Sequence, residues 1–232
     1  MRFSLLRLLL PSLLVLRLIP VAHAQASIPV SELEAARAAT ERFGPEARVL
    51  WHPVRRVPAA LLGLDVPVLG RTAEERATAF VVAHGELLGG IEVGALGTAR
   101  VSTARGATVV HFELQARGVT IADRSLAVTL SPAGRVTQVS SDWERLEVPA
   151  PSRDVGVAAA RRAAEVATGK TATGVVVKRV LAMGLAHGTL TYRVPVMRLP
   201  LVAADYCYVD FATAKLLLCL PATFDGPTEV VR

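Results

Sequence analysis

The histidines are the first residues to test for metal chemistry. Zinc hydrolysis needs ligands placed together, such as two histidines one helical turn apart with a glutamate between them. The histidines stand at positions 23, 52, 84, 111 and 187, and no two are four residues apart. His111 and Glu113 have H-x-E spacing, but in a strand they share one face and bring no further ligand. We therefore interpret them as a surface pair and predict no metal ion or cofactor.

Other catalytic groups are equally scarce. The sequence has no G-x-S-x-G nucleophile elbow and no phosphate-binding loop. His84 lies with Phe80 on an apolar helical face, which is typical of a core histidine. Four aspartates mostly flank expected turns, where a solvated, turn-forming role is common; they are Asp123, Asp142, Asp205 and Asp210. We predict that the protein is not an enzyme.

The chain has two cysteines, Cys207 and Cys219. The residues between them, YVDFATAKLLL, are typical of a β-hairpin with its turn near 212–213. Such a hairpin would set the two cysteines nearly opposite each other across the strands, although the sequence cannot establish the register. In an exported chain, a structural disulfide is the expected result.

The N-terminus predicts export. Residues 1–24 resemble a secretory signal peptide, with arginines before an apolar run and an A-x-A motif that places cleavage between Ala24 and Gln25. Arg17 and Pro11 interrupt the apolar run, so we expect no stable membrane insertion after cleavage. The leader holds three arginines and no acid, which reduces the net charge from +6 to +3. No basic tract stands out, and we expect no nucleic-acid partner.

Local patterns then order the elements along the mature chain. Two capping boxes, at 31–34 and 72–75, begin helices that should end at Gly44 and at 89–90. Residues 46–70 suggest one strand and an irregular wrap. Alternating apolar residues predict strands near 97–103, 107–116, 124–131 and 135–141. A proline-marked linker precedes a third helix, beginning near Ser152 or Asp154 and ending at Gly169. Four more strands should follow near 174–183, 189–197, 202–210 and 214–222.

The second half repeats the first at an offset of 80 residues. Gly89 corresponds to Gly169 at the helix exit, and the alternating strand positions correspond as well. Val110, Phe112 and Leu114 should correspond to Leu190, Tyr192 and Val194. Leu126 and Val128 should correspond to Tyr206 and Tyr208. Val136 should correspond to Leu216. Each unit should be a helix packed on an antiparallel meander, an α+β arrangement.

Residues 109–143 resemble the fungalysin/thermolysin propeptide (FTP) motif. The matching residues include an aromatic in a strand, a glycine before an apolar pair, and a glycine turn: Phe112, Gly118, Val119, Ile121 and Gly134. Residues 188–219 look like a PepSY domain, through Tyr192 and the turn at Asp210. The family has glycine where Asp123 and Ala214 stand, so the turns could differ there. The resemblance implies two cystatin-like units.

This resemblance implies a domain order. It assigns a signal peptide at 1–24, an N-terminal helix and lead-in strand at 25–70, an FTP-like domain at 71–147, a linker at 148–153, a PepSY-like domain at 154–222 and a C-terminal tail at 223–232. In the family, this order forms the pro-region of thermolysin-like and fungalysin-like zinc proteases, with a protease domain following. No H-E-x-x-H motif is present in this chain.

The resemblance also implies a partner. A propeptide-like protein would bind a separate secreted zinc metalloprotease, as inhibitor or folding chaperone. In the family, the chain after PepSY approaches the protease active site, so the tail supplies the candidate contacts: Phe224, Asp225, Gly226 and Pro227. Two alternatives stay open. The protein could be a general envelope or extracellular module that binds peptide, cell wall or protein, or the remnant of a truncated zymogen.

Overall fold

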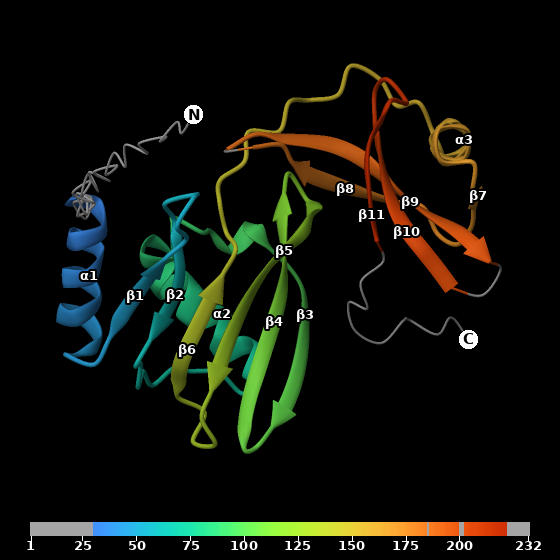
Figure 1. Cartoon of the computed structure of the whole chain (residues 1–232). Helices are drawn as coiled ribbons and strands as arrows, with labels where there is room; N and C mark the ends of the chain where they lie inside the picture. Colours follow the sequence, from blue (N-terminus) through green and yellow to red (C-terminus); the bar gives the residue numbers. More distant parts are fainter. Residues whose placement is uncertain (1–29, 185, 200–201, 222–232) are drawn as a thin grey trace, which may run out of the picture.

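The computed structural model describes residues 30–184, 186–199 and 202–221. Within these ranges, three α-helices and eleven strands form an α+β fold, which confirms the expected class (Figure 1). None of the helices in this part of the chain is long and apolar enough to cross a membrane. The predicted cleavage site at Ala24 and Gln25 and the predicted contacts Phe224, Asp225, Gly226 and Pro227 lie outside the described residues.

The first helix leads into a β-hairpin. Helix α1 (Val30–Phe43) ends before Gly44, and strands β1 (Arg48–Trp51) and β2 (Pro58–Leu62) pair antiparallel. The expectation of a single strand before an irregular wrap was therefore wrong. His52 closes the turn, because its Nδ1 accepts hydrogen bonds from the backbone of Val54 (3.2 Å) and Arg55 (3.1 Å). Pro58 is tolerated because it is the first residue of its strand.

The first unit consists of helix α2 on an antiparallel meander. Thr72 and Glu75 form the predicted capping box at the start of α2 (Ala73–His84). The α-helix ends at His84, and two 3-10 turns, η1 (Gly85–Leu88) and η2 (Val93–Ala95), complete the connection. The meander contains the strands β3 (Leu96–Ala104), β4 (Ala107–Ala116), β5 (Val119–Leu130) and β6 (Val136–Ser141). All four predicted strands are thereby confirmed.

The core of this unit lies between α2 and the sheet. Phe80 and Val81 of α2 meet alternate residues of β4 and β5, including Val110, Phe112 and Leu126, and all are buried. This arrangement follows from the two periodicities, because the helix presents one apolar stripe and each strand presents one apolar face. Phe112, a residue of the predicted motif, therefore has a packing role.

His84 packs against two aromatic rings but is half-buried, so it borders the core rather than lying within it as expected. Its ring centroid lies 4.9 Å from that of Phe43 on α1 and 4.7 Å from that of Phe80. Its Nδ1 is buried, with no hydrogen-bond partner among the described residues. Burial, and secondly the charge of Arg42, lower the pKa of His84 below its ordinary 6.5. The folded protein therefore favours the neutral imidazole.

Acidification is expected to destabilise the protein through His84. Because the folded-state pKa of His84 is lowered, the unfolded chain binds the proton more tightly than the folded chain does. The contribution of neutral His84 to the free energy of unfolding is therefore fully present above pH 6.5 and is lost as the pH falls through the folded-state pKa. His84→Phe keeps the aromatic packing and removes the titration. The difference in urea midpoint between about pH 7.5 and about pH 5 should therefore shrink in this variant. It should persist in His111→Gln, which alters an exposed histidine. An equal pH dependence in His84→Phe and the unmodified protein would contradict this account.

The second unit repeats the arrangement with α3 on strands β7–β11. Helix α3 (Val157–Thr168) packs Ala160 and Ala164 on the sheet, whose strands are β7 (Thr171–Ala172), β8 (Val177–Ala182), β9 (Gly188–Leu199), β10 (Val202–Asp210) and β11 (Leu216–Pro221). The helix begins later than predicted. Gly156 is its N-cap residue, at φ +82°. The carboxylate of Asp154 does not cap the helix; it accepts hydrogen bonds from the Gly156 backbone and the Tyr192 hydroxyl.

Strand β5 joins the two sheets. It pairs antiparallel with β4 and β6, and it pairs in parallel with β8 at Ile121 and Val180. The connected strands run in the order β1-β2-β6-β5-β8-β9-β10-β11, with β3 beside β4 and β7 beside β9. In Figure 1, the end of the first sheet that holds the β4–β5 turn lies beside the second sheet.

A buried ion pair lies at this junction. The guanidinium of Arg124 on β5 lies 3.4 Å from Glu144, and both side chains are largely buried. The other carboxylate oxygen of Glu144 accepts a hydrogen bond from the backbone N–H of Ala186, in the β8–β9 turn, at 3.0 Å. Arg124 also donates to the Asp142 carbonyl at 2.9 Å. Glu144 thus connects a strand of the first unit with a turn of the second.

One predicted correspondence between the units is wrong. Strands β6 and β11 do recur at an offset of 80 residues. However, Leu126 and Val128 face α2, whereas Tyr206 and Tyr208 lie on the face of the second sheet that is opposite α3. In the first unit, the last paired residues before the turn are Leu130 and Val136, which are six residues apart. In the second unit they are Val209 and Leu216, which are one residue further apart. A one-residue difference turns every side chain of a strand to the other face.

Candidate binding surface on the second sheet

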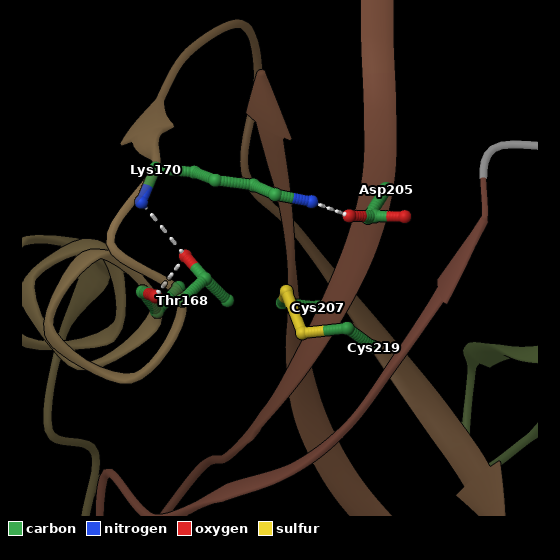
Figure 2. Close-up of a disulfide and its surroundings, with 6 residues drawn as sticks. Thr168, Lys170, Asp205, Cys207 and Cys219 are labelled. Atoms are coloured by element: carbon green, nitrogen blue, oxygen red, sulfur yellow. Dashed lines mark hydrogen bonds and ion pairs between the residues drawn. A yellow bond between two sulfur atoms is a disulfide. The ribbon is translucent and has the colours of Figure 1, made fainter. Parts of the chain in front are cut away.

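A disulfide joins β10 to β11. Cys207 and Cys219 are directly opposite in the strand register, with their Cα atoms 4.0 Å apart, as the predicted hairpin requires (Figure 2). Cys207 is fully buried under α3, and Cys219 is half-buried on the outer strand. Strand β11 pairs only with β10 among the described strands, so the disulfide fixes the exposed edge of the sheet.

An ion pair supports the same hairpin close to the disulfide. Figure 2 shows Lys170, just after α3, reaching Asp205 on β10. The hydroxyl of Thr168 accepts a hydrogen bond from the Lys170 backbone at 3.2 Å and donates one to the Ala164 carbonyl at 2.7 Å. These contacts tie the end of α3 to the hairpin. Asp205 had been predicted to be a turn residue; it lies within the strand instead.

The start of the second unit is anchored by Tyr192 and Asp154. The hydroxyl of Tyr192 on β9 donates to Asp154, which also accepts from the Gly156 backbone at 2.8 Å. Burial, and then the Asp154 charge and hydrogen bond, raise the pKa of Tyr192 to about 12. The hydrogen bond from Tyr192 is the main cause that lowers the pKa of Asp154. The Tyr192 ring also stacks on Phe211 at 5.0 Å, so this motif residue stabilises the fold.

The predicted hairpin turns have the backbone geometry that their residues suggest. Gly118 and Gly134 both have φ of +74°. A Cβ atom at Gly134 would meet only the flexible guanidinium end of Arg76, which can move away, so the positive φ is the reason that this turn favours glycine. Asp123 has φ of +55°, but it lies within β5, where the register with β4 shifts, so its predicted position beside a turn was wrong. Ala214 has φ of +58° in its turn, the left-handed conformation that favours glycine. Ala214 is therefore a strained position.

Asp210 organises the turn that precedes Ala214. One carboxylate oxygen accepts hydrogen bonds from the backbone of Ala212 (3.0 Å), the backbone of Thr213 (2.7 Å) and the Thr213 hydroxyl (2.7 Å). Burial works against ionisation, but these hydrogen bonds outweigh it and lower the pKa of Asp210. The turn-forming role predicted for this aspartate is confirmed.

The remaining predicted site residues lie in the strands of the first unit. Ile121 is buried where β5 meets β8, and Val119 begins β5 opposite Ala116. Glu113 lies 3.7 Å from Arg100 on the neighbouring strand and accepts a hydrogen bond from Thr120. His111 is exposed beside it. No cluster of three potential metal ligands occurs in the described residues.

The outer face of the second sheet, opposite α3, carries polar and aromatic side chains together. We call it the arginine–tyrosine face, and it comprises Arg179, Arg193, Tyr206, Tyr208, Leu217 and Leu218. Arg193 stands opposite Tyr208 on β10 and opposite Val177 on β8, two residues from Arg179. The two arginines are therefore diagonal neighbours on one face.

Contacts within the face orient these side chains. The Arg193 guanidinium carbon lies 4.5 Å from the centre of the Tyr206 ring. Tyr208 is only 2% exposed and packs against Ala122 of β5 and Leu181 of β8. Burial, and then the charge of Arg193, lower the pKa of Arg179. Burial, and then the charge of Asp123, raise the pKa of Tyr208.

The arginine–tyrosine face was not predicted from the sequence. Its signal was present, because Arg193 lies between Tyr192 and Val194 in an alternating strand and must point away from their core. Arg179 lies beside buried Val180 and points outward for the same reason. The incorrect correspondence of Tyr206 and Tyr208 with core residues concealed the aromatic part of the face.

Comparison with known proteins leaves the family open. No family model matches the chain, and no curated protein matches it. Among solved structures, the chain is similar to the Bacillus megaterium YpeB C-terminal domain, with 14% sequence identity and a TM-score of 0.38. That match covers 84% of this chain and 97% of the other.

Proposed function

We propose that this protein is an exported, non-catalytic binding protein whose partner is a secreted zinc metalloprotease of the thermolysin or fungalysin class. The proposal retains the propeptide-like role implied by the resemblance of the two units to FTP and PepSY. It includes the tail as the contact segment, through Phe224, Asp225, Gly226 and Pro227.

The braced β10–β11 hairpin is the observation that carries this proposal. Strand β11 ends at Pro221, a few residues before Phe224, the first proposed contact along the chain. The Cys207–Cys219 disulfide and the Lys170–Asp205 pair hold the hairpin on the sheet. A rigid base reduces the conformational entropy that is lost when a neighbouring segment binds. The disulfide also favours an oxidising compartment, where secreted proteases are found.

Deletion of residues 222–232 is expected to weaken protease inhibition at least about tenfold, equivalent to about 1.4 kcal/mol of binding free energy. Residues 25–232 and the deletion variant would be titrated into thermolysin and into a metalloprotease purified from the producing organism, and Ki measured with a fluorogenic peptide. A variant in which glycine and serine replace residues 222–232 controls for chain length and should behave like the deletion. Unchanged inhibition by both variants would refute the tail assignment.

A separate result would refute the partner itself. If residues 25–232 bind neither protease while retaining a cooperative thermal transition, the metalloprotease proposal fails. Retention on isolated cell wall would then favour the general binding module.

A further inference from the structure

The arginine–tyrosine face carries two positively charged side chains that the described carboxylates only partly neutralise. Neither Arg179 nor Arg193 lies within 4.0 Å of a carboxylate in the part of the chain that the structure describes. The hydrogen bond of the Arg179 guanidinium within the described residues goes to the neighbouring Lys178 carbonyl, at 3.0 Å. Glu113 acts on Arg179 from a distance but is held by Arg100 and Thr120. Two half-buried guanidinium groups therefore repel each other on one face.

The apolar part of the face lies beside these charges. Tyr206 and Tyr208 follow Arg193 across the sheet, and Leu218 stands opposite Tyr208 on the outermost strand. Leu217 and Leu218 are half-buried, and Leu220 is 39% exposed. Guanidinium groups that stack on tyrosine keep their planar donors available for a bidentate carboxylate. A ligand for this face would place carboxylates over the arginines and apolar groups over the leucines.

We propose that the arginine–tyrosine face binds an extended acidic peptide segment of a partner protein. The carboxylates of the segment pair with Arg179 and Arg193, and its apolar side chains pack on Tyr206 and Leu218. An extended segment fits because its side chains alternate, as the residues across the face do. Its identity as part of the metalloprotease rests on the proposed function, but acidic peptide binding itself does not.

A peptide is favoured over a nucleic acid by the surroundings of the face. Glu113 and Asp123 act electrostatically on Arg179 and Tyr208 at its border. These carboxylates disfavour a continuous polyanion, whereas a peptide brings only two separate carboxylates, one for each arginine. Nucleic-acid sites typically present a basic stripe that follows several phosphates.

The test uses residues 25–232 and fluorescein-labelled Gly-Leu-Glu-Leu-Glu-Leu-Gly, followed by fluorescence anisotropy. Arg193→Gln and the double variant Arg179→Gln/Arg193→Gln should each raise Kd at least about tenfold, because each removes charge-assisted hydrogen bonds. Arg193→Lys keeps the charge but not the planar donors and should give an intermediate Kd. Arg162→Gln is the matched control on exposed α3, and its Kd should equal that of the unmodified protein.

Three further probes complete the test: a neutral peptide, a change of salt and an oligonucleotide. The same peptide with glutamine in place of glutamate should bind at least about tenfold more weakly, and raising the salt from about 0.05 M to about 0.3 M should weaken only the acidic peptide. Equal binding of both peptides, or a double variant within about twofold of the unmodified protein, would overturn the inference. Tighter binding of a labelled dT10 oligonucleotide would also overturn it. Peptide binding without protease binding would support this face and refute only the proposed partner.

Discussion

Replacing Glu144 with alanine is expected to lower the free energy of unfolding by about 3 kcal/mol. The change leaves the Arg124 guanidinium, only 14% exposed, without its carboxylate. It also removes the hydrogen-bond acceptor of the Ala186 backbone. The remaining hydrogen bond from Arg124 to the Asp142 carbonyl offsets part of this cost. Urea unfolding followed by circular dichroism would measure the loss.

Two variants test whether burial causes this effect. Glu92→Ala breaks an exposed pair with Arg145, and its stability should remain within about 0.5 kcal/mol of the unmodified protein. Glu144→Gln keeps a carbonyl acceptor and should fall between Glu144→Ala and the unmodified protein. A loss below about 1 kcal/mol for Glu144→Ala would show that the pair does not stabilise the junction of the two units.

Loss of the Cys207–Cys219 disulfide is expected to cost about 3 kcal/mol. The bond closes a loop with a sequence separation of 12 residues, and opening it returns chain entropy to the unfolded state. For a chain of this size, the melting temperature should fall by about 6–12 °C. The Cys207→Ala/Cys219→Ala variant and the unmodified protein in dithiothreitol should both show this loss by calorimetry.

The response to reductant separates the disulfide from other consequences of the substitutions. Dithiothreitol should lower the melting temperature of the unmodified protein and have no effect on the double variant. Because the hairpin borders the proposed tail contact, protease inhibition should weaken together with stability. A melting temperature that does not respond to reductant in the unmodified protein would contradict a stabilising role for the disulfide.

Local chemistry explains which elements were predictable. The capping box of Thr72 and Glu75 and the turn at Asp210 depend on residues a few positions apart, and the structure has both. The hairpin that pairs Cys207 with Cys219 was predictable for the same reason, because its strands are adjacent in sequence. The predicted helix exit at Gly89 was wrong, because α2 ends at His84 and Gly89 instead caps the 3-10 turn η1 that follows it. The His52 turn was missed because its prolines suggested irregular structure, while a side-chain acceptor closes it.

The sequence by itself determined the α+β class, most helix and strand positions, and the disulfide, because these follow from periodicity, capping and short-range pairing. Only the tertiary structure decided which face of β10 is buried, where β5 meets β8, and that Arg179 and Arg193 lie together. These features depend on a one-residue difference in turn length and on contacts between distant segments. No local sequence pattern encodes these features, because the packing energy that selects them arises only when the two sheets are in contact.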